Sequence, residues 1–160
     1  VKVGQKLSQR EIAKLLDISP TSVGKSLPIL EKEGFLTKKQ NKKIKLSHIE
    51  LNRDNPGAIV LKRTENLKRL YYSGLVEFLE EKFPGAVIVL FGSYSKGEDL
   101  YNSDIDIAII GCKGKQVDLT KYEKFLEKKI LINFYDNLGK INKNLKYNLF
   151  NGINLVGEFY

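Results

Sequence analysis

Two aspartates separated by a single isoleucine are the residues of this sequence best suited to chemistry. Asp104 and Asp106 open the run Asp-Ile-Asp-Ile-Ala-Ile-Ile, whose alternation predicts a strand with both carboxylates on one face. Aspartate is disfavoured in strands, and two neighbouring carboxylates repel each other. A divalent cation with oxygen ligands accounts for the pair best, and Mg²⁺ is the metal we expect.

A glycine–serine turn stands shortly before this pair. Residues 86–91 are apolar throughout, which predicts a central strand covered on both faces, and Gly92 and Ser93 follow it directly. Glycine lets a backbone N–H approach an oxyanion, and the Ser93 hydroxyl can donate as well. Acidic metal ligands beside such a turn suit a nucleoside triphosphate (NTP), and Lys96 is expected to lie along it.

The elements that must support these residues follow from apolar spacing. Residues 58–83 predict one long helix that bends at Ser73-Gly74 and stops at Pro84-Gly85. Its apolar face is predicted to comprise Val60, Leu67, Tyr71, Leu75 and Phe78. A helix from Leu119 to Lys129 and a strand from Ile130 to Tyr135 come next. The charged residues Glu98 and Asp99, and the lysines of residues 121–129, are expected to face solvent.

The segment from Leu90 to Asp106 resembles the signature of the DNA polymerase β-like nucleotidyltransferase superfamily, and in particular its minimal nucleotidyltransferases. That signature is Gly-Ser, ten residues and Asp-x-Asp, and residues 94–103 are the ten here. Over residues 58–160 the resemblance implies an α/β palm with a short mixed sheet flanked by helices. It also implies that Gly92 and Ser93 hold an NTP, and that Asp104 and Asp106 bind Mg²⁺ as the catalytic carboxylates.

The family normally has a third carboxylate on the next strand, where it helps to hold the metal that activates the attacking hydroxyl. Here that strand offers Leu131 or Asn133, depending on the alignment, and neither is acidic. Asp118 precedes the helix, and Asp136 lies at the strand end on the other face, so either could substitute only through an unusual geometry. Loss of this ligand weakens the nucleophile-activating side of a two-metal mechanism but leaves nucleotide binding intact.

The N-terminal third predicts a helix-turn-helix. Ser8 to Glu11 form a capping box for a first helix with Ile12, Leu15 and Leu16 on one face. Ser19-Pro20 starts a second helix with a buried stripe of Val23, Leu27 and Leu30, and Gly34 ends it. Pro28 lies inside this helix, where it should kink it or cost about 3 kcal/mol unless Gly24 relieves the clash.

A hairpin with a lysine-rich tip is predicted next. Residues 35–37 and 44–46 are the expected strands, and the tip between them includes Lys38, Lys39, Lys42 and Lys43. Together the elements predict a winged helix that binds duplex DNA, with Thr21, Ser22 and Lys25 facing the major groove and the lysines meeting phosphates. A protein–protein adaptor is the alternative for this fold.

Charge and composition agree with two modules of α+β class. We expect a winged helix-turn-helix domain at residues 1–55 and a minimal nucleotidyltransferase domain at 56–160, with 58–83 as the connecting helix. Residues 1–57 hold 12 Lys+Arg and 6 Asp+Glu, so +6 of the net charge of +8 lies there. One cysteine and one histidine exclude an internal disulfide and a Cys/His zinc site.

No apolar run of about 18 residues and no signal-peptide pattern is present, so we expect a cytoplasmic protein without a membrane span. Because the chain begins with Val1, and no helix precedes the predicted pair, we expect a trimmed N-terminus. The two-module order resembles a group of prokaryotic, largely archaeal, proteins.

Two functions stay open at this point. The intact aspartate pair and turn favour an enzyme that transfers a nucleoside monophosphate from an NTP to an acceptor hydroxyl, on a protein (a partner toxin included), a small molecule or a nucleic-acid end. The missing third acid favours a catalytically impaired transcription regulator that senses nucleotide or dimerises. A second subunit or another partner could complete the site in either case.

Overall fold

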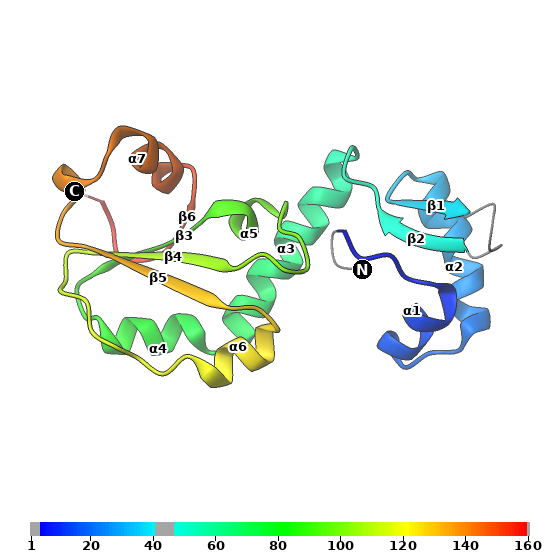
Figure 1. Ribbon diagram of the computed structural model, residues 1–160, viewed down its shortest axis with the longest axis horizontal. Coiled ribbons are helices and arrows are strands. Elements are labelled where there is room, and N and C mark those ends of the chain that lie inside the picture. The colour runs from blue at the N-terminus through cyan, green and yellow to red at the C-terminus, as the bar shows by residue number, and fades with distance from the viewer. Residues whose placement is uncertain (1–3, 41–46, 160) are drawn as a thin grey trace. The chain divides into compact units, whose positions relative to one another are not determined.

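The computed structural model of this chain describes residues 4–40 and 47–159. The chain forms two compact units, Val1–Leu61 and Lys62–Tyr160 (Figure 1). Among the described residues, no helix is both long enough and apolar enough to cross a membrane.

The first unit contains two helices followed by a two-stranded hairpin. Its elements are α1 (Gln9–Leu16), α2 (Pro20–Lys32), β1 (Leu36–Gln40), β2 (Ser47–Leu51) and the start of α3 (Pro56–Tyr72). The capping box of α1 is confirmed: the Ser8 hydroxyl accepts from Glu11 N (3.3 Å), and Ser8 N donates to the Glu11 carboxylate (2.7 Å). Ser19 caps α2 with Pro20 as the first helical residue, as expected.

The core of the first unit is small. It comprises Leu7, Ile12, Ala13, Val23 and Ile49, with Leu27 and Leu36 packed against it. Leu15 and Leu16, predicted on one helical face with Ile12, do not join this core, since they are 66% and 61% exposed. The buried face of α1 is centred on Ile12 and Ala13 and is only one turn long, so the last turn of the helix extends beyond it. Leu30 is also exposed, at 37%.

Helix α2 continues through Pro28 and ends where it was predicted to end. Gly34 adopts φ +77°, and Phe35 N donates to the Leu30 carbonyl (2.9 Å), which is the hydrogen bond of a Schellman C-cap. Gly24 of α2 leaves room for the side chain of Gln9 of α1, because a side-chain carbon at Gly24 would lie 2.7 Å from Gln9 Nε2.

The hairpin differs from its prediction in register. Strands β1 and β2 pair antiparallel with Lys38 across from Ile49 and Lys39 across from His48, so both lysines lie within a strand and not at the tip. Residues 44–46, predicted as the second strand, and the predicted wing residues Lys42 and Lys43 lie outside the described residues. Ile49 also pairs with Leu7 through two backbone hydrogen bonds (2.7 and 3.2 Å).

The second unit is a mixed sheet with helices on both faces. Its further elements are α4 (Leu75–Lys82), β3 (Val87–Phe91), α5 (Gly92–Lys96), β4 (Ile105–Ile110), α6 (Thr120–Leu126), β5 (Ile130–Tyr135), the 3₁₀ turn η1 (Leu138–Lys140), α7 (Lys143–Phe150) and β6 (Ile153–Val156). The strand order is β5-β4-β3-β6. The neighbours β4 and β5 pair parallel, whereas β3 pairs antiparallel with both β4 and β6. Helices α4 and α6 lie on one side of the sheet and α7 on the other (Figure 1).

Both faces of the sheet are buried, which confirms the prediction for the apolar central strand β3. Ile88 and Leu90 pack with Ile105 and Ile107 of β4 in the larger core cluster. Val89, with Ala108 of β4 and Leu149 of α7, belongs to the smaller cluster on the opposite face.

The predicted long helix of residues 58–83 is two helices. Gly74 adopts φ +73° and separates α3 from α4, and the Ser73 hydroxyl accepts from Leu75 N (3.2 Å) at the break. The predicted apolar face was also partly wrong, because Val60 and Tyr71 are 60% and 42% exposed. In their place α3 buries Leu70 together with the polar side chain of Asn66.

Candidate functional site

The glycine–serine turn and the aspartate pair meet at one end of the sheet. Phe91, the last residue of β3, pairs with Asp106 of the antiparallel strand β4, and Gly92 follows Phe91. A side-chain carbon at Gly92 would overlap Asp106 Oδ2 and lie 3.2 Å from Asp106 Cγ. Gly92 also adopts φ +73°, a conformation that favours glycine. The glycine therefore leaves the space that the carboxylate occupies.

The aspartates alternate with core residues as the pattern predicted. Asp104 directly precedes β4 and Asp106 is its second residue; both are half-buried, whereas Ile105 and Ile107 are fully buried. Burial raises the pKa of the Asp106 carboxyl, and the charge of Asp104 raises it further. A cation beside the pair would remove this penalty, and two carboxylates with open access for water or phosphate oxygens fit Mg²⁺.

The polar segment after Gly92 begins as a short helix, not a loop. Helix α5 has five residues, and the Ser95 hydroxyl donates to the Gly92 carbonyl oxygen (2.8 Å). Ser93 and Lys96 belong to the same helix as Gly92. Ser93 is half-buried, whereas Lys96 is exposed. Tyr94 is buried, and burial raises the pKa of its phenol to about 12.

The strand register shows where the two alternatives for the third acid lie relative to Asp106. Parallel pairing sets Leu131 of β5 across from Asp106, and Asn133 two positions further along, across from Ala108. Leu131 is 46% exposed, so nothing in the core requires leucine there. Asp136 lies past the far end of β5 and bonds Lys140 (2.7 Å). Within the described residues, no group of three or more Asp, Glu, His or Cys could hold a metal ion.

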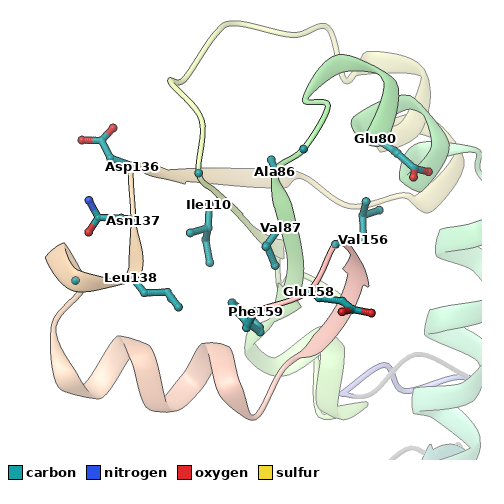
Figure 2. Close-up of a pocket in the computed structure, with 14 residues that line it drawn as sticks. Glu80, Ala86, Val87, Ile110, Asp136, Asn137, Leu138, Val156, Glu158 and Phe159 are labelled. Atoms are coloured by element: carbon teal, nitrogen blue, oxygen red, sulfur yellow. The ribbon is translucent and has the colours of Figure 1, made fainter.

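An open groove of about 800 Å³ lies at the opposite end of the sheet, where β3 begins and the other strands end (Figure 2). Asp136, one of the two possible substitutes for the third acid, lines it, but the turn, Lys96 and the aspartate pair do not. Its labelled carboxylates, those of Glu80, Asp136 and Glu158, stand apart at its rim and do not converge (Figure 2). This groove is therefore separate from the aspartate pair.

Sequence reasoning missed a set of buried polar residues next to the turn and the pair. We call Lys62, Asn66, Asp99 and Lys128 the Asp99 network. Asp99 was expected to face solvent, yet it is 1% exposed, with its carboxylate 2.5 Å from Lys62 Nζ and 3.1 Å from Lys128 Nζ. Lys128 was expected on an exposed helix face, but α6 ends at Leu126 and the Lys128 side chain is 7% exposed.

The charges of the network compensate one another. Burial alone would raise the pKa of the Asp99 carboxyl, but hydrogen bonds from Lys62 and Asn66 and the charge of Lys62 hold it below its usual value. A helical row of Lys62, Asn66 and Leu70, each four residues apart, was the available signal in the sequence.

The described residues that were predicted to contact DNA are all exposed, but they differ in whether they already have a partner within the protein. Thr21, Ser22 and Lys25 are exposed in the first two turns of α2. Lys38 and Lys39 are exposed on β1, and Lys39 Nζ lies 3.1 Å from the carboxylate of Glu50. Lys39 is therefore already paired within the protein.

The comparison with known families concerns the second unit. Residues 73–150 match the family model of the nucleotidyltransferase domain. No curated protein matches the chain. The matched stretch contains Gly92, Ser93, Asp104, Asp106 and Leu131, so the part of the chain that holds the candidate site is similar to a nucleotidyltransferase domain.

Proposed function

We propose that the second unit binds a metal–NTP complex and transfers its nucleoside monophosphate to an acceptor hydroxyl, releasing pyrophosphate. The observation that supports this best is the close approach of Gly92 and Asp106, because it brings the glycine–serine turn and the aspartate pair to one corner of the sheet. The match of residues 73–150 to the nucleotidyltransferase domain supports the same chemistry.

Each site residue has a role in this proposal. Asp104 and Asp106 would hold Mg²⁺, which when bound neutralises charge on the phosphates during phosphoryl transfer. The backbone of Gly92 and the hydroxyl of Ser93 bind triphosphate oxygens, and exposed Lys96 adds a positive charge alongside. The acceptor is a hydroxyl of a protein (such as a partner toxin), a small molecule or a nucleic-acid end.

For the first unit we propose a winged helix that binds duplex DNA. Two helices joined by a short turn precede a hairpin, and Leu7 adds a bridge to its strand β2. The exposed start of α2 would enter the major groove and Lys38 would meet the phosphates. The +6 charge of residues 1–57 supports a polyanionic partner.

A second function is favoured by one specific observation. Leu131 stands across from Asp106, where a third carboxylate would help to activate the acceptor. A regulator that binds nucleotide without transferring it needs no such acid. A regulator that uses this domain only to dimerise needs none either. The nucleotide-binding regulator shares the metal and nucleotide residues with the enzyme and differs only in the transfer step.

One experiment separates the two. The full chain is incubated with Mg²⁺, each NTP labelled at the α-phosphate, and acceptor pools of protein, small molecules and nucleic-acid ends. An enzyme transfers the α-label, releases pyrophosphate and loses both activities in Asp104→Asn, whereas Asp136→Asn at the other sheet end retains them. NTP binding without transfer supports the nucleotide-sensing regulator. Absence of NTP binding contradicts both the enzyme and the nucleotide sensor and leaves only a dimerising regulator.

A further inference from the structure

The Asp99 network contacts both halves of the candidate site, the glycine–serine turn and the aspartate pair, through the residues next to them. Asn66 and Asp99 are buried, and the side chains of Lys62 and Lys128 that meet them are only 11% and 7% exposed, although apolar residues could fill the same volume at lower cost. Their contacts show what the polar groups provide that apolar packing would not.

The ammonium of Lys128 is matched to the loop that leads into Asp104. It lies 3.1 Å from Asp99 Oδ2 and donates to the carbonyl oxygens of Leu100 (2.7 Å) and Ser103 (3.0 Å). An ammonium has three N–H donors, and all three acceptors belong to residues 99–103. One buried cation therefore fixes the path of this loop.

Asp104 is held on both of its sides. The Ser103 carbonyl before it accepts from the Lys128 side chain, and the Ile105 N–H after it donates to the Lys129 carbonyl (2.8 Å). The Leu100 to Ser103 turn closes on itself, since Leu100 N donates to the Ser103 hydroxyl (2.9 Å). The backbone of the first metal-binding aspartate is thereby fixed without any bond to its carboxylate.

Asn66 connects the other half of the site to the same carboxylate. Its amide donates to the Tyr94 carbonyl (3.0 Å) and to Asp99 Oδ1 (2.6 Å), and its oxygen accepts from Lys62 (3.1 Å). The Tyr94 hydroxyl donates back to the Asn66 carbonyl (3.1 Å). Tyr94 directly follows Ser93, just as Ser103 directly precedes Asp104.

We propose that Lys128 and Asn66 are positioning residues, which set Asp104 and Ser93 at a fixed separation through their shared bonds to Asp99. This inference rests on the proposed metal–triphosphate site. Asp104 and Asp106 would hold the metal while the glycine–serine turn would hold the phosphates, so both halves of the site would need a defined separation. Outer-shell partners of metal ligands typically affect metal affinity by about 10- to 100-fold.

The test uses two lysines that bind the same carboxylate. Lys128→Met removes one ammonium from Asp99 together with the donors to Leu100 and Ser103, whereas Lys62→Met removes the other ammonium from Asp99 and keeps the donors to Leu100 and Ser103. Mn²⁺ affinity of the full chain is measured by electron paramagnetic resonance, and amide hydrogen exchange is measured over residues 100–106. We expect Lys128→Met to weaken Mn²⁺ binding by about tenfold or more and to speed exchange there. Lys62→Met should change the Mn²⁺ affinity and the exchange rate over residues 100–106 by no more than about twofold, which is the usual error when substitutions at independent sites are treated as additive.

A matched variant tests the other half. Asn66→Leu should speed exchange in residues 92–98 and weaken Mn²⁺–ATP binding more than binding of Mn²⁺ alone. If Lys128→Met unfolds, Lys128→Arg replaces it, because a planar guanidinium keeps the ion pair but not the three-acceptor arrangement. Equal effects of the two lysine variants, with wild-type binding intact, would overturn the positioning role alone. A wild-type chain that binds neither Mn²⁺ nor nucleotide overturns the proposed function as well.

Discussion

Gly92 and Asp106 share one corner of the sheet, and the carboxylate of Asp106 fills the space where a side chain of residue 92 would begin. We therefore predict that Gly92→Ala displaces Asp106 and abolishes Mg²⁺-dependent NTP binding, as measured by calorimetry. It should also lower the free energy of unfolding by at least about 1–2 kcal/mol, because φ +73° strains alanine.

Gly74→Ala is the control for this substitution. Gly74 has the same φ of +73°, but an added side-chain carbon there meets nothing within 4 Å. It should destabilise the fold through backbone strain alone and leave ligand affinity unchanged. Equal loss of binding in the two variants would mean that strain, and not the contact with Asp106, sets affinity.

Asp106→Asn is predicted to stabilise the metal-free protein at neutral pH. The pKa of Asp106 is raised above its usual 3.8 by burial and by Asp104, so the wild type loses stability as pH rises from about that value through the folded-state pKa. The amide lacks this loss, so its Tm in EDTA should exceed that of the wild type by a few degrees. Added Mg²⁺ should raise the Tm of the wild type and leave the variant unchanged; a lower Tm of Asp106→Asn in EDTA at pH 7 would contradict the prediction.

Leu131→Asp should restore the acid that the register places beside Asp106. Leu131 is 46% exposed, so the substitution removes little buried surface, although the new carboxylate repels Asp106 until a cation is bound. The added carboxylate should tighten Mn²⁺ binding by about tenfold, a typical effect of one added close charge. Asn133→Asp adds the same charge across from Ala108, two positions away, and should have a smaller effect. Equal gains from both positions would indicate a general electrostatic effect and not a ligand.

For the first unit, we predict salt-dependent binding to duplex DNA with unequal roles for its two described wing lysines. Lys38→Ala should reduce the slope of log K against log salt by about one unit, whereas Lys39→Ala should reduce it less, because Glu50 already pairs with Lys39. Fluorescence anisotropy across a salt series measures both. Lys124→Ala, an exposed lysine of the other unit, is the control, and binding that is indifferent to salt would exclude the DNA proposal.

Local patterns in the sequence predicted where the glycine–serine turn and the aspartate pair lie in the fold better than they predicted the residues that surround them. The alternation of Asp104 to Ile107 and the apolar run before Gly92 each specify a strand and its faces, so the meeting of turn and aspartates could be expected. The capping residues Ser8 and Ser19 act within one helical turn and were likewise readable.

The errors arose where polar groups are buried by tertiary contacts. Helix α3 buries Asn66 because Tyr94 of α5 and Asp99 satisfy its amide, so a count of apolar residues finds only part of the buried face. Asp99 and Lys128 lie 29 positions apart in sequence, and no spacing rule connects them. The hairpin register was missed because Lys38 and Lys39 resemble turn residues, yet they continue the strand across from Ile49 and His48.

The alternation along β4 has a consequence for how reliably the chain folds. A slip of one residue in its pairing with β3 or β5 would carry Asp104 and Asp106 into the apolar cluster and expose isoleucines in their place. Two unpaired carboxylates in that cluster would cost several kcal/mol, so the mispaired sheet is strongly disfavoured. The residues proposed for metal binding thus also help to fix the register of strand β4 as the sheet forms.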